Sequence, residues 1–252
     1  MKLSDIKHFL VGKAKNPFDP GIFRRISLVA LLAWVGLGAD GLSSSCYGPE
    51  QAYLGLNGSG FLVVYLAIAV ALTIAIISLS YSQIIEEFPL GGGGYTVATK
   101  LISPSAGVVA GSALIVDYVL TIAISVASGV DAIFSFLSPQ FQSYKVISCI
   151  LGVSILIILN LRGVKESITI LLPIFAIFVI THIIMIGSAL FQHSAALTAF
   201  VLDSVPQTRT MVQSTGIWAM LFILLKAYTH GAGTFTGIEA VSNALPTLSE
   251  PR

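Results

Sequence analysis

The stretch ITILLPIFAIFVITHIIMIGSAL, from Ile168 to Leu190, indicates the fold class because it is apolar along its length and holds no Asp, Glu, Lys or Arg. A helix needs about 20 mostly apolar residues to cross the hydrocarbon core of a bilayer. Six stretches of this kind occur in the chain, at approximately 27–56, 61–86, 105–137, 144–161, 166–190 and 215–245. We therefore expect an all-α integral membrane protein in which these stretches form six transmembrane helices.

The composition agrees with a membrane location. Of the 252 residues, 55% are hydrophobic and only 10% are charged, and the mean hydropathy is +0.91. A soluble domain carries far more charge on its surface. The apolar runs are also longer than the roughly ten-residue strands of a membrane β-barrel. The one long connection, at 191–214, is polar and could hold a small helix.

The basic residues predict how the chain is oriented. With the N-terminus placed inside, most of the 13 lysines and arginines fall on the cytoplasmic side, and only Lys145 and Arg209 fall outside. This asymmetry follows the positive-inside rule. We expect a basic cytoplasmic N-terminus at 1–26 and a transmembrane domain at 27–252, in a plasma (inner) membrane of the bacterial type. The net charge of +1 gives no reason to expect a nucleic-acid partner.

Three acidic residues fall near the middle of predicted membrane helices, namely Asp40, Asp117 and Glu239. An ionised side chain at that depth costs at least about 2.5 kcal/mol on insertion scales. Such residues normally face the interior of the bundle, where they pair with other groups or bind an ion. A structural polar network or a protonated carboxyl is the alternative for any one of them. For all three together, a functional role is the better interpretation.

The third predicted helix carries a polar stripe that begins at its acid. Asp117, Thr121, Ser125 and Ser128 recur at steps of four, four and three, so they share one face of a helix, and Tyr118 stands beside them. Ser and Thr hydroxyls in membrane helices often bond the carbonyl four residues back, which is the structural alternative. In line with a carboxylate, they suggest the wall of a polar pathway.

The first and sixth predicted helices contain residues that disfavour helix at mid-depth. Gly36, Gly38 and Gly41 surround Asp40, and GAGTFTG at 231–237 comes directly before Glu239. Interrupted membrane helices are typical of transporter binding sites, because the unwound backbone offers carbonyls to cations and is tolerated only where it lines a cavity. Close helix packing through small residues would explain the glycines but not the acids. We predict a break in both helices.

Three motifs in order make the chain similar to the amino acid–polyamine–organocation (APC) superfamily. They are EEFPLGGGGYTVATK at 86–100, NLRGVKES at 160–167 and TGIEAVSNALPTLSEPR at 236–252. The resemblance implies the LeuT-type inverted-repeat fold of ten core helices, in which helices 1 and 6 are broken at the substrate site. This chain would supply the first five-helix repeat and helix 6, so we expect it to be the first half of such a transporter, truncated relative to the family.

Within the superfamily, the first helix points to a cation. Amino-acid permeases bind the substrate carboxylate at a glycine-rich break there, and a fixed Asp40 would repel it by roughly 4 kcal/mol at 4 Å for an effective dielectric constant of 20. The stretch DGLSSSCYGPEQ at 40–51 instead resembles KimA-like members of the KUP potassium uptake family. That resemblance implies potassium binding or proton coupling by Asp40, Tyr47, Asp117, Tyr118, Thr121, Ser125, Thr236 and Glu239.

Secondary active uptake of potassium by alternating access, coupled to protons, is therefore our first hypothesis. Glu239 is the first choice for proton coupling and Asp40 the second. The expected partners are a potassium ion, a proton and the lipid bilayer, and a homodimer is one possible assembly. We expect no enzymatic activity and no cofactor. A permease for amino acids or polyamines is the second hypothesis, and a membrane fragment that transports nothing is the third.

Overall fold

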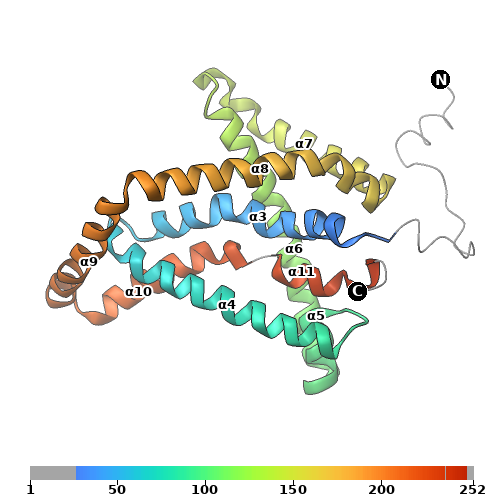
Figure 1. Ribbon diagram of the computed structural model, residues 1–252, viewed down its shortest axis with the longest axis horizontal. Coiled ribbons are helices and arrows are strands. Elements are labelled where there is room, and N and C mark those ends of the chain that lie inside the picture. The colour runs from blue at the N-terminus through green and yellow to red at the C-terminus, as the bar shows by residue number, and fades with distance from the viewer. Residues whose placement is uncertain (1–26, 236, 249–252) are drawn as a thin grey trace, which may run out of the picture. The chain divides into compact units, whose positions relative to one another are not determined.

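The computed structural model describes residues 27–235 and 237–248. Apart from one isolated β-bridge between Leu28 and Leu248, the regular structure in these residues is helical, which confirms the predicted all-α class (Figure 1). The helices are α3 (Ala30–Gly55), α4 (Val63–Glu87), α5 (Gly93–Val97), α6 (Pro104–Phe134), α7 (Lys145–Arg162), α8 (Val164–Gln192), α9 (Ser194–Thr215), α10 (Ile217–His230) and α11 (Ile238–Asn243).

Four helical stretches in the described part of the chain are long and apolar enough to cross a membrane. They are Gly60–Glu87, Pro104–Phe134, Pro139–Leu161 and Ser167–Gln192, and a fifth is reached if the bent pair Ser194–Thr215 and Ile217–Asn243 counts as one span. The chain is thus an integral membrane protein. The remaining stretch at 27–56 forms α3, which is helical but less apolar than these four stretches.

The helix α3 is continuous from Ala30 to Gly55, so the predicted break in the first helix is wrong. The three serines at 43–45 donate hydrogen bonds to helix carbonyls. Ser43 donates to the Asp40 carbonyl at 2.8 Å and Ser45 to that of Leu42 at 2.6 Å. Hydroxyls satisfied in this way are compatible with a membrane helix. Glycines lower helix propensity by only about 1 kcal/mol each, which tertiary packing can offset.

The interruption predicted in the sixth helix is confirmed. The helix α10 ends at His230 and a 3-10 turn follows at Gly231–Phe235. Gly237 then has a φ of 87°, a left-handed conformation that favours glycine, before α11 begins at Ile238. Glu239 therefore stands in the first turn of the short helix that follows the interruption.

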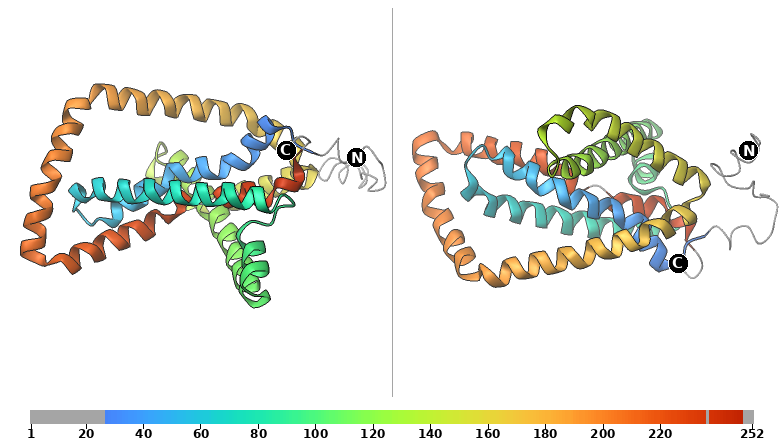
Figure 2. Two further views of the ribbon diagram at one scale, coloured as in Figure 1. Left: turned by 60° about the horizontal axis from the view of Figure 1, so that its bottom comes forward. Right: turned by 90° about the horizontal axis from the view of Figure 1, so that it is seen from above.

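The connection predicted at 191–214 proves to be α9, a helix of 22 residues. Hydroxyl side chains of α9 donate hydrogen bonds to carbonyls of the same helix. Thr208, for example, donates to the Ser204 carbonyl at 2.7 Å, and Thr210 donates to that of Pro206 at 3.0 Å. Figure 2 shows α9 turning the chain between the end of α8 and α10. Gly216, whose φ is 90°, provides the corner between α9 and α10.

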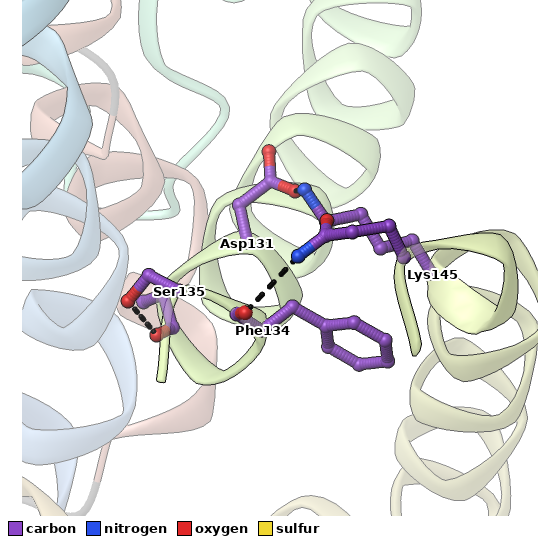
Figure 3. A network of polar contacts seen from close by, with 6 residues as sticks. Asp131, Phe134, Ser135 and Lys145 are labelled. Atoms are coloured by element: carbon purple, nitrogen blue, oxygen red, sulfur yellow. Dashed lines mark hydrogen bonds and ion pairs between the residues drawn. The ribbon is translucent and has the colours of Figure 1, made fainter. Parts of the chain in front are cut away.

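The described residues form two compact units. The first contains residues up to 39, 84–174 and 239 onward, and the second contains 40–83 and 175–238. In the first unit α6 and α7 form a hairpin. Lys145 pairs with Asp131 at 2.7 Å across its turn, and Gln142 donates to the Phe134 carbonyl at 3.2 Å (Figure 3).

In the second unit, the C-terminal part of α3 packs closely on α10 and on the turn after it. A Cβ placed on Gly55 would lie 2.8 Å from Ala227 Cα, and one on Gly231 would lie 2.7 Å from Ala52 Cβ. Ala52 and Ala227 belong to the buried core cluster that also includes Leu56, Leu62 and Leu66. Helix α4 lies beside α10, where Thr73 and Tyr228 share a hydrogen bond of 2.8 Å. Small residues thus allow α3 to approach the interrupted helix, as packing between membrane helices requires.

Substitution of Gly55 by Ala should destabilise this unit by about 1–3 kcal/mol, because the added methyl would meet backbone that cannot move aside cheaply. Denaturant unfolding of the protein in detergent measures the effect. Gly187→Ala in α8 is the matched control, because no atom lies within 4 Å of the added Cβ, and it should be neutral or stabilising. Equal stability of the two variants would contradict the close packing.

Candidate functional site

The glycine loop before α5 and the helix α11 pack together in the first unit. Gly93 has a φ of 44°. A Cβ at this position would lie 2.7 Å from both Asn243 Oδ1 and Ser242 Oγ, and 3.2 Å from Glu239 Oε1. Only glycine fits this contact without displacing the polar side chains. Two of the motifs that suggested the superfamily, around Gly93 and Glu239, therefore meet in space.

A second contact joins α11 to the polar face of α6. The Asn243 amide donates a hydrogen bond of 2.9 Å to the Tyr118 hydroxyl. Asn243 Oδ1 is buried, and no hydrogen-bond partner for it occurs in the described structure. Ser242 is fully buried and donates to the Glu239 carbonyl at 2.8 Å. An orphaned acceptor of this kind costs free energy unless a proton donor or a cation satisfies it.

Asn243 was missing from the residues predicted from the sequence. It follows Glu239 by four positions, so both lie on one face of a helix. That spacing was visible in the sequence and could have identified Asn243.

The hydroxyls along α6 differ from those of other membrane helices in the chain. Thr73, Ser80, Ser154 and Thr181 each donate to the carbonyl four residues back. For Thr121 and Ser125 no hydrogen bond is found within the described residues, and the same holds for the exposed carboxylate of Asp117. The structural alternative for these hydroxyls, bonding to their own helix, is therefore not what the structure shows. The stripe presents oxygen atoms that are available to a ligand.

Asp40 and Tyr47 lie in the second unit, on the part of α3 that faces the interruption. A Cβ at Gly237 would lie 2.6 Å from the Gly41 nitrogen and 3.1 Å from Asp40 Cγ. Tyr47 is 5% exposed and its ring lies against Gly233. Its hydroxyl is buried with no hydrogen-bond partner in the described part of the chain. Thr236, the remaining predicted site residue, lies outside the described residues.

The chemistry of both groups is that of hard oxygen donors. The first unit contributes the carboxylates of Asp117 and Glu239, the hydroxyls of the stripe and Asn243 Oδ1. The second contributes Asp40, the Tyr47 hydroxyl and the backbone of the turn after α10. Within the described residues no three His, Cys, Asp or Glu side chains gather as a metal site. Carboxylate, hydroxyl and carbonyl oxygens suit alkali cations or a protonated amine.

Comparison with known proteins places these residues in a family context. The family model described as "Amino acid permease" matches residues 26–252. The potassium transporter KimA of Bacillus subtilis (strain 168) is 36% identical over 250 residues, which cover 98% of this chain and 40% of that protein. The low-affinity putrescine importer PlaP of Escherichia coli (strain K12) is 25% identical over 174 residues, covering 66% of this chain and 35% of that protein. The chain thus spans less than half the length of both relatives.

The contact between Asn243 and Tyr118 can be tested by a double-mutant cycle. Asn243→Ala and Tyr118→Phe should each destabilise the protein, and the double variant should show a coupling free energy of about 0.5–1.5 kcal/mol. Unfolding in detergent provides the measurement. Pairing Asn243→Ala with Tyr144→Phe, whose ring is exposed, gives the additive control. Additivity in both cycles would rule out the hydrogen bond.

Proposed function

We propose that this chain, which belongs to the amino acid permease family, takes part in the proton-coupled uptake of potassium across a membrane. The family model covers residues 26–252, and the potassium transporter of Bacillus subtilis is similar along nearly the whole chain. Because the chain spans 40% of that relative, the activity is proposed for the protein in which these helices operate.

The observation that carries the proposal is the set of oxygen atoms without protein partners. The hydroxyls of Thr121 and Ser125 form no hydrogen bond among the described residues, and Asn243 Oδ1 and the Tyr47 hydroxyl are buried without a hydrogen-bond partner there. A potassium ion is bound by replacing its hydration shell with several oxygen ligands. We assign potassium binding to Asp40, Tyr47, Asp117, Tyr118, Thr121, Ser125, Thr236 and Glu239, and we add Asn243.

Proton coupling is assigned to Glu239 first and to Asp40 second. Both acids flank glycine-rich backbone, Glu239 directly after the interruption and Asp40 beside Gly237 in close contact. A carboxylate in a membrane site is protonated more readily when its cation leaves, because the favourable charge interaction is lost. The same residue can then bind a cation and a proton in turn during alternating access.

The remaining topology predictions are proposed together with this function. We assign residues 1–26 to the cytoplasm, where their lysines and arginines follow the positive-inside rule. Residues 27–252 would form six transmembrane helices in a bacterial-type inner membrane. In this assignment the proposed potassium ligands lie near mid-membrane, where transporters of this architecture bind their cargo.

Transport of an amine is the second candidate. The similarity to a putrescine importer and the description of the family model both favour it. Three acids could bind a dication such as putrescine as well as they bind a metal ion. The argument against an amino acid as substrate is Asp40, whose charge would repel the substrate carboxylate.

Growth of bacteria that lack potassium uptake, at low external potassium, tests the first candidate. The protein expressed from its whole coding sequence should restore growth, and Asp117→Asn or Glu239→Gln should abolish it by removing a ligand charge. Asp131→Asn, the same change on the same helix, alters an exposed ion pair instead and should grow like wild type. Glu87→Gln, at the exposed end of α4, is the control for Glu239. Normal growth of both site variants would refute the assignment.

Competition in vesicles separates the two candidates. Uptake of radioactive rubidium, a potassium analogue, should be blocked by excess potassium and by a protonophore, and putrescine should leave it unchanged. Under the amine hypothesis labelled putrescine enters, and potassium does not compete. Rubidium uptake that persists after collapse of the proton gradient would remove proton coupling while keeping potassium transport.

A further inference from the structure

Tyr228, near the end of α10 in the second unit, has no part in the potassium site as proposed above. Its hydroxyl lies 2.8 Å from Thr73 Oγ1 on α4. Thr73 donates its own proton to the Ala69 carbonyl at 2.9 Å, so the Tyr228 hydroxyl is the donor of the bond between the two side chains. The polar end of Tyr228 is thereby fixed to the neighbouring helix, as buried tyrosine hydroxyls usually are.

The ring of Tyr228 reaches the interruption that follows α10. Its centroid lies 5.4 Å from that of Phe235, at an interplanar angle of 42°. Phe235 is the last residue of the 3-10 turn Gly231–Phe235. Aromatic rings at this distance attract each other in addition to the burial of their surfaces. Tyr228 therefore connects α4 to the end of the turn through one hydrogen bond and one ring contact.

The start of the same turn is held by α3. A Cβ on Gly231 would lie 2.7 Å from Ala52 Cβ, and one on Gly233 would lie 3.0 Å from Tyr47 Cε2. Helix α3 thus covers the first residues of the turn, and Tyr228 contacts its last residue. Because the hydrogen bonds of a 3-10 turn have poorer geometry than those of an α-helix, these outside contacts contribute to the shape of the turn.

We propose that Tyr228 and Thr73 set the selectivity of the transporter for potassium over sodium by fixing the shape of the turn after α10. This inference rests on the proposed function, in which the backbone of that turn offers oxygen atoms to the ion. The spacing and number of oxygen ligands decide which alkali cation a site prefers. A fixed turn cannot close around the smaller sodium ion, whereas a loosened turn can. Tyr228 acts through Phe235 and is a positioning residue.

Calorimetric titration of the purified full-length protein with potassium chloride and, separately, with sodium chloride measures the selectivity. Tyr228→Phe removes the donor and keeps the ring, so the potassium Kd should rise about two- to tenfold, the effect of one ordinary hydrogen bond. The ratio of the sodium Kd to the potassium Kd should fall. Thr73→Val should have the same effect, and the double variant should be no worse than either single variant, because both remove one interaction.

Two control variants separate positioning from general damage to this part of the protein. Thr73→Ser keeps the hydroxyl that accepts from Tyr228, so it should retain the selectivity of wild type. Tyr65→Phe removes another tyrosine hydroxyl, on α4 beside the same core cluster, that forms no hydrogen bond among the described residues. It should bind both ions like wild type. Loss of selectivity in Tyr65→Phe equal to that in Tyr228→Phe would overturn the proposal.

Hydrogen–deuterium exchange of the amides at 231–235 reports on the turn in the absence of any ion. Tyr228→Phe and Thr73→Val should accelerate this exchange about two- to tenfold, and Tyr65→Phe should leave it unchanged. Unchanged exchange in Tyr228→Phe would overturn the proposal. Faster exchange with an unchanged ratio of the two Kd values would also overturn it, because Tyr228 would then have a structural role only. Wild type that binds neither ion would refute the proposed function, while the exchange rates would still decide whether Tyr228 holds the turn.

Discussion

An interrupted helix within a bilayer exposes backbone N–H and C=O groups that lipid cannot bond, and this constraint governs the second unit. The interruption after His230 must be covered by protein, and the small residues of α3 provide the cover. Gly48, Ala52 and Gly55 follow one another at steps of four and three, and each comes close to the interrupted segment. Gly36, one of the three glycines that we took as the sign of a second break, is also used for packing, because a Cβ there would collide with the Ile168 side chain. Packing does not explain the acids, for which we propose a bound cation.

The same distinction between satisfied and unsatisfied groups separates structural from functional polar residues. The serines at 43–45 bond their own helix and need nothing else. Thr121 and Ser125 do not bond theirs. Tyr47 and Asn243 keep one buried oxygen each without a partner among the described residues. A buried unsatisfied polar atom costs about 1–3 kcal/mol, and we propose that a ligand offsets this cost at Tyr47 in the second unit and at Asn243 in the first.

The apolar helices could be predicted from the sequence because hydrophobic length alone determines whether a segment can cross a bilayer. The interruption before Glu239 was also predictable, since Gly and Thr, which disfavour helix, accumulate there. The continuous helix α3 was not predictable from the sequence. Helix propensity penalises each glycine but contains no information about the neighbouring segment that can pack closely where the side chain is missing. Asn243 was missed although its spacing from Glu239 was visible. The helix α9 is longer than the small helix that we expected, because its hydroxyls form hydrogen bonds within the helix. Assignment of the acids to potassium remains a prediction.

Direct binding of potassium tests the central claim most simply. Isothermal titration of the purified protein with potassium chloride in sodium-free and amine-free buffer should show saturable binding, and Glu239→Gln should abolish it while Glu87→Gln leaves it unchanged. We expect that putrescine does not displace the ion. Saturable binding of putrescine in place of potassium, or potassium binding that survives Glu239→Gln, would contradict it.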